Sequence, residues 1–204
     1  MKIKFTKGEL KKQRDALKQY ERYLPTLQLK KQQLQLEILH QYSLLGEKKE
    51  LLAAKKQSAL SWAGLLAEGP VDFAKIISPK NVITTEKNIA GVDIPVFEKA
   101  EFEKAAYDLF ITPLWVDAGL EFLRECILLR EEIKIIEKGI VILRHELRIT
   151  AQRVNLFEKV KIPEAEEAIR LIKIYIGDQM VNAVGRSKIA KAKIEQEMLA
   201  EVPV

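Results

Sequence analysis

The chain has few of the residues that compact folds and disulfide-rich proteins need. Its 204 residues include one cysteine, nine glycines and 7% aromatic residues. The single cysteine, Cys126, excludes an intramolecular disulfide, and a reduced, buried thiol in a cytosolic protein is expected. Extended helical proteins use few glycines and aromatic residues, whereas a compact domain usually carries more of both. The low content therefore favours an extended helical chain.

Long hydrophobic runs are missing as well. No stretch of about 18 consecutive apolar residues occurs, so no membrane-spanning helix is expected. The start of the sequence is not followed by an apolar run, so we expect no signal peptide. Any association with a membrane would therefore come through partner proteins.

Patterns that indicate catalysis or metal binding are also absent. No glycine-rich phosphate loop occurs, and no Cys, His or paired carboxylate accompanies either His40 or His145. The acidic residues of 164–167 resemble paired carboxylates, but acids placed just after Pro163 stabilise the first turn of a helix. The sequence therefore predicts no catalytic, cofactor-binding or metal-binding residue.

The strongest pattern present is an apolar stripe whose steps alternate between three and four residues. Its members are Phe122, Cys126, Leu129, Ile133, Ile136, Ile140, Leu143, Leu147, Thr150, Val154 and Phe157. This rhythm is typical of a coiled coil, because a helix with 3.5 residues per turn keeps such a stripe facing one partner. A stripe of this length needs a second long helix to cover it.

The N-terminal region supplies that second helix. Thr6 and Glu9 have the spacing of a capping box at its start, and helix-forming residues continue to about Glu68. Two heptad columns follow, one of Leu10, Leu17, Leu24, Ile38, Leu45 and Leu52, the other of Tyr20, Leu27 and Leu34. An arm of some 60 residues would be on the order of 90 Å long. Pro25 removes one intrahelical donor, so we expect a kink there or a new helix starting near Leu24.

Polar residues interrupt both columns of this arm. Lys31 falls in the first column, and Gln41, Lys48 and Lys55 fall in the second. Such an imperfect seam is what a rod partly wrapped by another protein would show.

The middle of the chain loses the heptad pattern. Residues 81–85 and 91–96 favour strands, and Pro95 restricts the second to a sheet edge. We expect a small β-hairpin or a loop-rich cap at the tip of a helical hairpin. The predicted fold class is therefore all-α, a long antiparallel two-helix coiled coil with a short β-hairpin or loop-rich segment at the middle of the chain.

Three regions result from these patterns. They are an N-terminal coiled-coil arm over 1–68, a loop or β-hairpin segment over 69–113, and a C-terminal coiled-coil arm over 114–204 that begins near Pro113. The third region is interrupted near Pro163, where the register of the stripe changes as it would at a stutter or local unwinding.

Basic residues gather near both ends of the chain, whose net charge is +5. Lys11 and Lys12 lie near the start, and Arg186, Lys188 and Lys191 lie near the end. In an antiparallel pair both clusters would lie at one end. They either keep the rod soluble or form a positive tip that rests on an acidic protein surface. Aromatic residues are not interleaved with them, which disfavours single-stranded nucleic acid.

The most specific motif lies within residues 149–163. It comprises Arg153-Val154-Asn155, an acidic residue three positions further, and Ile162-Pro163 leading into a final helical stripe. This motif resembles the C-terminal signature of the D subunits of V-type and archaeal A-type rotary ATPases. The succession of helix, short β-containing middle and longer helix is similar to that family over nearly the whole chain.

The resemblance implies a non-catalytic central rotor shaft subunit. Such a subunit would transmit torque between the catalytic ring and the membrane ion-translocating ring of a complex that couples ATP synthesis or hydrolysis to hydrogen ion transport. The implied partners are the catalytic and regulatory subunits of the ring, the small F subunit of the stalk and the subunit that couples the stalk to the membrane ring. The implied location is cytoplasmic and peripheral to the membrane through the complex, without cofactor, nucleic acid or direct membrane insertion.

Interaction residues are predicted from the motif and from the basic clusters. They are Arg153, Val154, Asn155, Ile162, Pro163, Lys11, Lys12, Arg186, Lys188 and Lys191. Two other functions use similar heptads: a coiled-coil chaperone or secretion-apparatus scaffold, and a nucleic-acid-binding coiled coil with steeply salt-dependent affinity. Neither is expected to carry the motif of residues 153–163 together with a β-prone middle.

Overall fold

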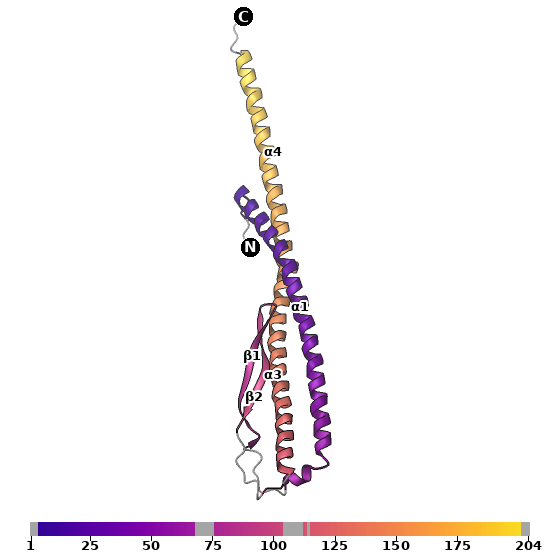
Figure 1. The fold of residues 1–204 in the computed structure, drawn as a ribbon. Coiled ribbons are helices and arrows are strands. Elements are labelled where there is room, and N and C mark those ends of the chain that lie inside the picture. The colour runs from indigo at the N-terminus through magenta and orange to yellow at the C-terminus, as the bar shows by residue number, and fades with distance from the viewer. Residues whose placement is uncertain (1–3, 68–75, 104–111, 114, 201–204) are drawn as a thin grey trace. The chain divides into compact units, whose positions relative to one another are not determined.

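The computed structural model describes residues 4–67, 76–103, 112–113 and 115–200. The helices are α1 (Lys7–Ala59), a short 3₁₀ helix (Ala63–Ala67), α3 (Trp115–Leu156), a π-helical turn (Phe157–Lys161) and α4 (Ile162–Ala200). The strands are β1 (Pro79–Ile89) and β2 (Val92–Phe102), which form one antiparallel hairpin (Figure 1). Of the described residues 80% are helical, and the predicted all-α fold class with a hairpin at mid-chain is confirmed.

The chain divides into two units, each with its own packing. The terminal unit comprises Met1–Gln28 with Gln152–Val204, and the hairpin unit comprises Leu29–Ala151. In the hairpin unit α1 and α3 run antiparallel, because ion pairs join Lys30 to Glu146 at 3.1 Å and Lys48 to Glu132 at 2.9 Å.

The core of the hairpin unit consists of the predicted seam and of strand β2. One cluster holds Leu34, Ile38, Val92, Ile94 and Leu143, and a second holds Leu45, Ile133 and Ile140, with Leu52, Ile136 and Leu147 packed against the two clusters. Leu34 and Leu143 are 0% exposed. Each buried leucine or isoleucine contributes about 1.5–3 kcal/mol through the hydrophobic effect, so this seam is the main stabilising feature of the unit.

Three of the four polar interruptions of the seam, all but Lys31, find partners inside the chain. Lys48 pairs with Glu132, and the Lys55 ammonium donates a hydrogen bond to the Glu125 carboxylate. Gln41 is buried, and its Nε2 donates to the Glu37 carboxylate at 2.8 Å. These positions therefore need no second protein to cover them.

The hairpin has a two-residue turn at Ala90 and Gly91, both with positive φ, 51° and 76°. Such a turn matches the twist of the flanking strands. The Gly91 N–H donates to Asn88 Oδ1 at 3.1 Å, and Asn88 Nδ2 donates to Asp93 Oδ1 at 2.6 Å. The predicted strands are present and are longer than the β-prone segments alone. Pro95 is tolerated because both strands of a two-stranded sheet are edges.

The hairpin lies along α3 and does not cap the tip of the helical pair (Figure 1). Ile94 packs against Gly139, where an added Cβ would be in ordinary van der Waals contact, 3.9 Å from the Ile94 Cβ. At the other end of β2, the Arg124 guanidinium donates to the Glu103 carbonyl at 2.7 Å and lies 5.3 Å from the Phe102 ring centroid. The expectation of a cap at the tip is wrong, because the apolar face of β2 is buried against the helices.

Helix α1 ends at Ala59, nine residues before the predicted end near Glu68. Hydrogen bonds of the tighter three-residue type follow, from the Leu60 N–H to the Gln57 carbonyl and from the Trp62 N–H to the Ala59 carbonyl. The predicted stop at residues 69–70 lies outside the described residues. At the far side of the middle segment, α3 begins at Trp115, close to the predicted start.

In the terminal unit, the predicted helix start is confirmed in part. The Glu9 N–H donates to Thr6 Oγ1 at 3.2 Å, which is half of a capping box. The Glu9 carboxylate instead accepts from Gln13 Nε2 at 2.8 Å. Helix α1 continues through Pro25, so the expectation of a new helix near Leu24 is wrong.

The register change near Pro163 is produced by the π-helical turn. The Ile162 N–H donates to the Phe157 carbonyl, five residues back, and Pro163 has no N–H to donate. The predicted interruption is therefore one widened turn between α3 and α4. Beside it the Phe157 ring stacks on Tyr20, with the ring centroids 5.4 Å apart.

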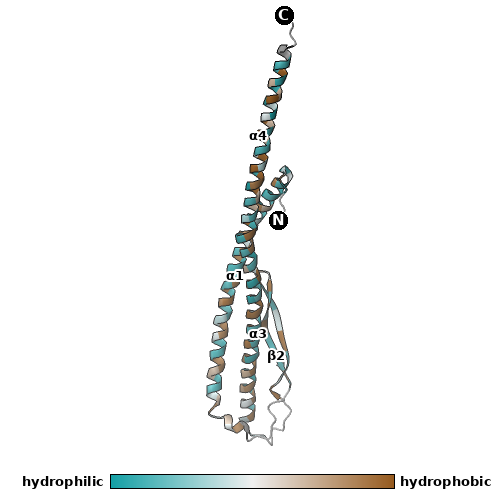
Figure 2. Ribbon diagram, turned by 180° about the vertical axis from the view of Figure 1, so that it is seen from behind, coloured by the Kyte–Doolittle hydropathy of each residue, from teal (hydrophilic) through white to brown (hydrophobic). Residues whose placement is uncertain are grey.

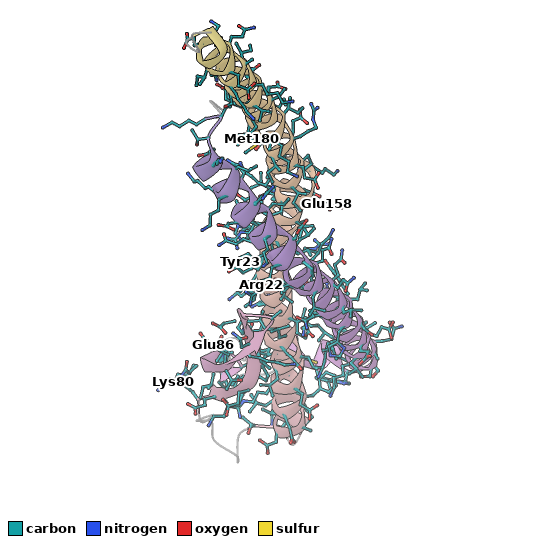
Figure 3. All side chains as sticks on the ribbon, turned by 90° about the horizontal axis from the view of Figure 1, so that it is seen from above. Arg22, Tyr23, Lys80, Glu86, Glu158 and Met180 are labelled. Carbon is teal, nitrogen blue, oxygen red and sulfur yellow. The ribbon has the colours of Figure 1, made fainter. Side chains whose placement is uncertain are left out.

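The core of the terminal unit is small. It consists of Val154, Ala165, Ala168, Ile169 and Ile172. Phe5 and Tyr175 pack together further along, with their ring centroids 5.0 Å apart. Tyr23 and Met180, labelled in Figure 3, are 56% and 51% exposed and belong to the outer surface of this unit.

Candidate interaction surfaces

The predicted motif residues divide into one buried anchor and an exposed polar surface. Val154 is 4% exposed and lies in the core, whereas Arg153 and Asn155 on either side of it are exposed. Ile162 is half-buried and Pro163 is exposed. The motif therefore positions an arginine, an asparagine and a proline on the surface around the π-helical turn, and their role in binding stays a prediction.

Charged side chains surround the start of α4, close to this turn. Arg170 donates two hydrogen bonds to the Glu167 carboxylate, at 2.8 and 2.7 Å, and these bonds lower the pKa of Glu167 and raise the pKa of Arg170. Lys161 lies 3.4 Å from Glu164. A shallow cavity of about 260 Å³ adjoins Tyr20 here. The charged residues that line this cavity, Lys161, Glu164 and Glu167, all take part in these pairs.

The two predicted basic clusters both lie in the terminal unit, at different heights along its helices. Lys11 and Lys12 are exposed on α1, and Arg186, Lys188 and Lys191 are exposed on α4. The contact between Phe5 and Tyr175 shows which part of α4 lies beside the start of α1. Arg186 follows residue 175 by eleven positions, which is about 17 Å along a helix. Both clusters belong to the terminal unit, but they are offset along it, because α4 continues past the start of α1. That they form one positive tip stays a prediction.

The last part of α4 is apolar as well as basic. Val181, Val184, Ile189 and Ile194 are 71%, 54%, 61% and 52% exposed. Brown, hydrophobic bands recur along α4 in Figure 2. Exposed apolar side chains on successive turns of one helix indicate a protein–protein contact surface.

Both tryptophans of the chain lie in the hairpin unit, near the end of α1 and the start of α3. Trp62 and Phe122 meet edge to face with ring centroids 5.2 Å apart. Gly119 lies beside both tryptophans: a Cβ added there would be 3.4 Å from the Trp115 ring and 3.7 Å from the Trp62 ring, which is van der Waals contact. Trp62, Leu65, Trp115 and Phe122 line a cavity of about 310 Å³.

A second group of exposed leucines was not anticipated from the sequence. Leu29, Leu36 and Leu39 are 55%, 67% and 66% exposed on α1. The seven-residue step from Leu29 to Leu36 could have indicated this surface. The seam columns of the same helix are longer, however, and they had already explained its apolar residues. These leucines are therefore an additional surface feature of the hairpin unit.

The described residues contain no group of three or more His, Cys, Asp or Glu side chains arranged to hold a metal ion. In the same residues, no helix is long and apolar enough to cross a bilayer.

Cys126 gives a test of packing in the hairpin unit. Burial raises the pKa of its thiol, against a smaller lowering effect of Lys55. At pH 8 the folded protein should therefore react with a disulfide reagent several-fold more slowly than the protein in denaturant, because less thiolate is present and access is reduced. Absorbance of the released thiolate measures the rate. Equal rates in the two states would contradict burial at this position.

Known proteins resemble this chain over nearly its whole length. The family profile described as the D subunit of ATP synthase matches residues 9–192. The D subunit of a V-type ATP synthase from Borreliella burgdorferi is 48% identical over 196 residues, covering 95% of each chain. The V-type ATP synthase D subunits of Chlamydia caviae and Chlamydia abortus are 33% and 32% identical over 197 residues, covering 95% of this chain and 94% of theirs.

Proposed function

Because the chain belongs to the family of ATP synthase D subunits, we propose that it is the central rotor shaft of a V-type or A-type ATPase. In this role it transmits torque between the catalytic ring and the membrane ion-translocating ring. The chain itself is non-catalytic, and the chemistry of ATP takes place in the ring around it. The complex works at the cytoplasmic side of the membrane.

The packing of the hairpin unit supports this proposal. A continuous apolar seam and ion pairs between α1 and α3 make a stiff helical pair, since both helices are held at several levels. The surfaces around this pair also differ, with the β-hairpin beside α3 and exposed leucines on α1. A rotating element with unequal faces presents different contacts to each nucleotide site, and those differences shift the affinity of each site.

The exposed residues in the last part of α4 are the main reason to expect contact with the ring. Val181 and Ile189 are among its exposed apolar residues, and Arg186, Lys188 and Lys191 add positive charge. We assign this segment to the interior of the ring of catalytic and regulatory subunits. The small F subunit of the stalk and the subunit that couples the stalk to the membrane ring contact the hairpin unit.

Reconstitution tests the proposal. The full chain is mixed with the catalytic and regulatory subunits from the same source, and co-elution and ATPase activity are measured. The full chain should co-elute with the ring and sustain ATP hydrolysis, whereas a chain ending at Met180 should not. The control is Leu51→Ser, an exposed leucine outside α4. A ring that assembles without retaining the full chain would refute the rotor assignment.

Torque is tested separately in the assembled complex. A bead is attached through Lys87→Cys, an exposed strand position, in a Cys126→Ser background. The bead should turn in one direction when ATP is added. A complex that hydrolyses ATP while the bead only fluctuates would show that the chain binds the ring without acting as a shaft.

A further inference from the structure

A second apolar stripe lies on α1 in the hairpin unit, outside the seam. Leu36 and Leu39 are 67% and 66% exposed, whereas Leu34 and Ile38 beside them are buried in the seam. Because residues three, four and seven apart share a helix face, Leu29, Leu36 and Leu39 line one side of α1 that leads away from the seam. Packing within the hairpin unit therefore does not explain why these positions are leucines.

The stripe borders a groove between α1 and α3. The groove has a volume of about 610 Å³ and is lined by Gln32, Gln35, Leu36, Ile38, Leu39 and Leu147. Ile38 and Leu147, from the seam, form its apolar floor, and the only polar groups in the lining are two neutral amides. Such a groove suits apolar side chains better than a charged small molecule.

Small residues continue this face of α1 beyond Leu39. Ser43 and Gly46 follow at four and seven positions, and both are exposed. A Cβ added at Gly46 would meet no atom within 4 Å. The backbone of α1 is therefore open to close approach by another helix at this level, as at other helix contacts that use small residues.

Three basic residues lie within about one helical turn of residues that line the groove. The Arg144 guanidinium lies 5.2 Å from the ring centroid of Tyr42, which follows Leu39 by three positions. Arg148 is one turn further along α3, and Lys31 is one turn before Gln35. Among the described residues, none of these three cations is in an ion pair with an acidic side chain. By contrast, the cations that pair α1 with α3 are matched one to one by glutamates: Lys30 with Glu146, Lys48 with Glu132, Lys49 with Glu137 and Lys55 with Glu125.

From these observations we propose that the groove is the docking surface for an acidic amphipathic helix of another subunit of the same complex. The apolar side chains of the docking helix lie on Leu36, Leu39 and the floor of the groove. Its carboxylates pair with Arg144 and Arg148. A helix is the fitting element because the groove runs between two helices and offers side chains at three- and four-residue spacing. This inference rests on the proposed function, since it takes the partner from the rotary complex.

Two pairs of substitutions in the full chain test the docking surface. Leu36→Ser with Leu39→Ser removes the apolar contacts, and Arg144→Glu with Arg148→Glu reverses the charge beside the groove. Lys134→Glu with Lys138→Glu is the matched control, because it makes the same charge change on another part of α3. All six positions are exposed, so circular dichroism and melting temperature should stay close to those of the wild-type chain.

The probes are the other purified subunits of the complex from the same source, titrated one at a time. One subunit should bind the wild-type chain and lose about tenfold or more in affinity with each groove pair, since a well-placed charge or apolar contact in an interface is worth more than 1 kcal/mol. The arginine pair should also remove most of the salt dependence of binding. The control should change the affinity less than about twofold.

The outcomes separate the two proposals. If every subunit that binds the wild-type chain binds both groove variants equally well, the docking surface is wrong and the rotor function stands. If binding depends on Leu36 and Leu39 but is indifferent to the charge of Arg144 and Arg148, the acidic character of the partner is wrong. If no subunit binds the wild-type chain, the proposed function fails together with the inference.

Discussion

Replacing Leu143 with aspartate should separate α1 from α3 in the hairpin unit and uncouple ATP hydrolysis from ion movement in the assembled complex. Leu143 is 0% exposed and joins the two helices to strand β2 in one cluster. Truncation of a buried leucine costs about 2–5 kcal/mol of unfolding free energy. An unpaired buried carboxylate adds several kcal/mol more. Thermal unfolding followed by circular dichroism measures the loss of stability.

Val141→Asp is the control for this change. Val141 is two residues away on the same helix and is 66% exposed, so the same carboxylate would lie in water. Its melting temperature should stay within a few degrees of that of the wild-type chain. A Leu143→Asp protein with an unchanged melting temperature and full coupling would contradict both the packing and the shaft function.

The seam could be predicted from the sequence because it depends on local periodicity. Ile133, Ile140 and Leu143 repeat at three- and four-residue steps, and all three are buried. A helix places such residues on one face whatever the partner is, so the pattern alone indicates burial. The antiparallel arrangement followed from two long arms and one intervening segment.

The position of the hairpin could not be predicted in the same way. It depends on the packing of Ile94 against Gly139 and on the contact of Arg124 with the end of β2, both of which join segments far apart in the sequence. The turn is also weakly signalled, since Ala90 adopts a positive φ that is unusual for alanine. The sequence therefore left a hairpin and a loop-rich cap as alternatives.

Candidate interaction residues could be selected from the sequence only where they carry a motif or a charge cluster. Arg153 and Asn155 were identified from the motif, and they are exposed. Leu36 and Leu39 were missed because a leucine in a heptad-rich helix is expected to face the seam. Which leucines remain exposed depends on the rotation of α1 about its own axis, and tertiary packing sets that rotation.

Replacing Ile172 with aspartate should open the terminal unit while leaving the hairpin unit folded. Ile172 is 0% exposed, and two of the other core residues of this unit are alanines, which bury little apolar area. The unit therefore depends strongly on this one side chain. Amide hydrogen exchange should become faster by at least tenfold over residues 7–28 and 165–176, because local opening needs less free energy than global unfolding.

Ile174→Asp is the matched control, since Ile174 is two residues further along α4 and 50% exposed. Its exchange pattern should match that of the wild-type chain in both units. In the Ile172→Asp protein, protection of Leu34, Ile38 and Leu143 should persist, because these residues belong to a separate cluster. Equal loss of protection in both units would show that they unfold together. Unchanged exchange over residues 7–28 would show that Ile172 does not hold α1 to α4. Persistent protection of the hairpin unit alone would show that the terminal unit is the less stable of the two. Contacts with partner subunits would then have to supply the missing stability.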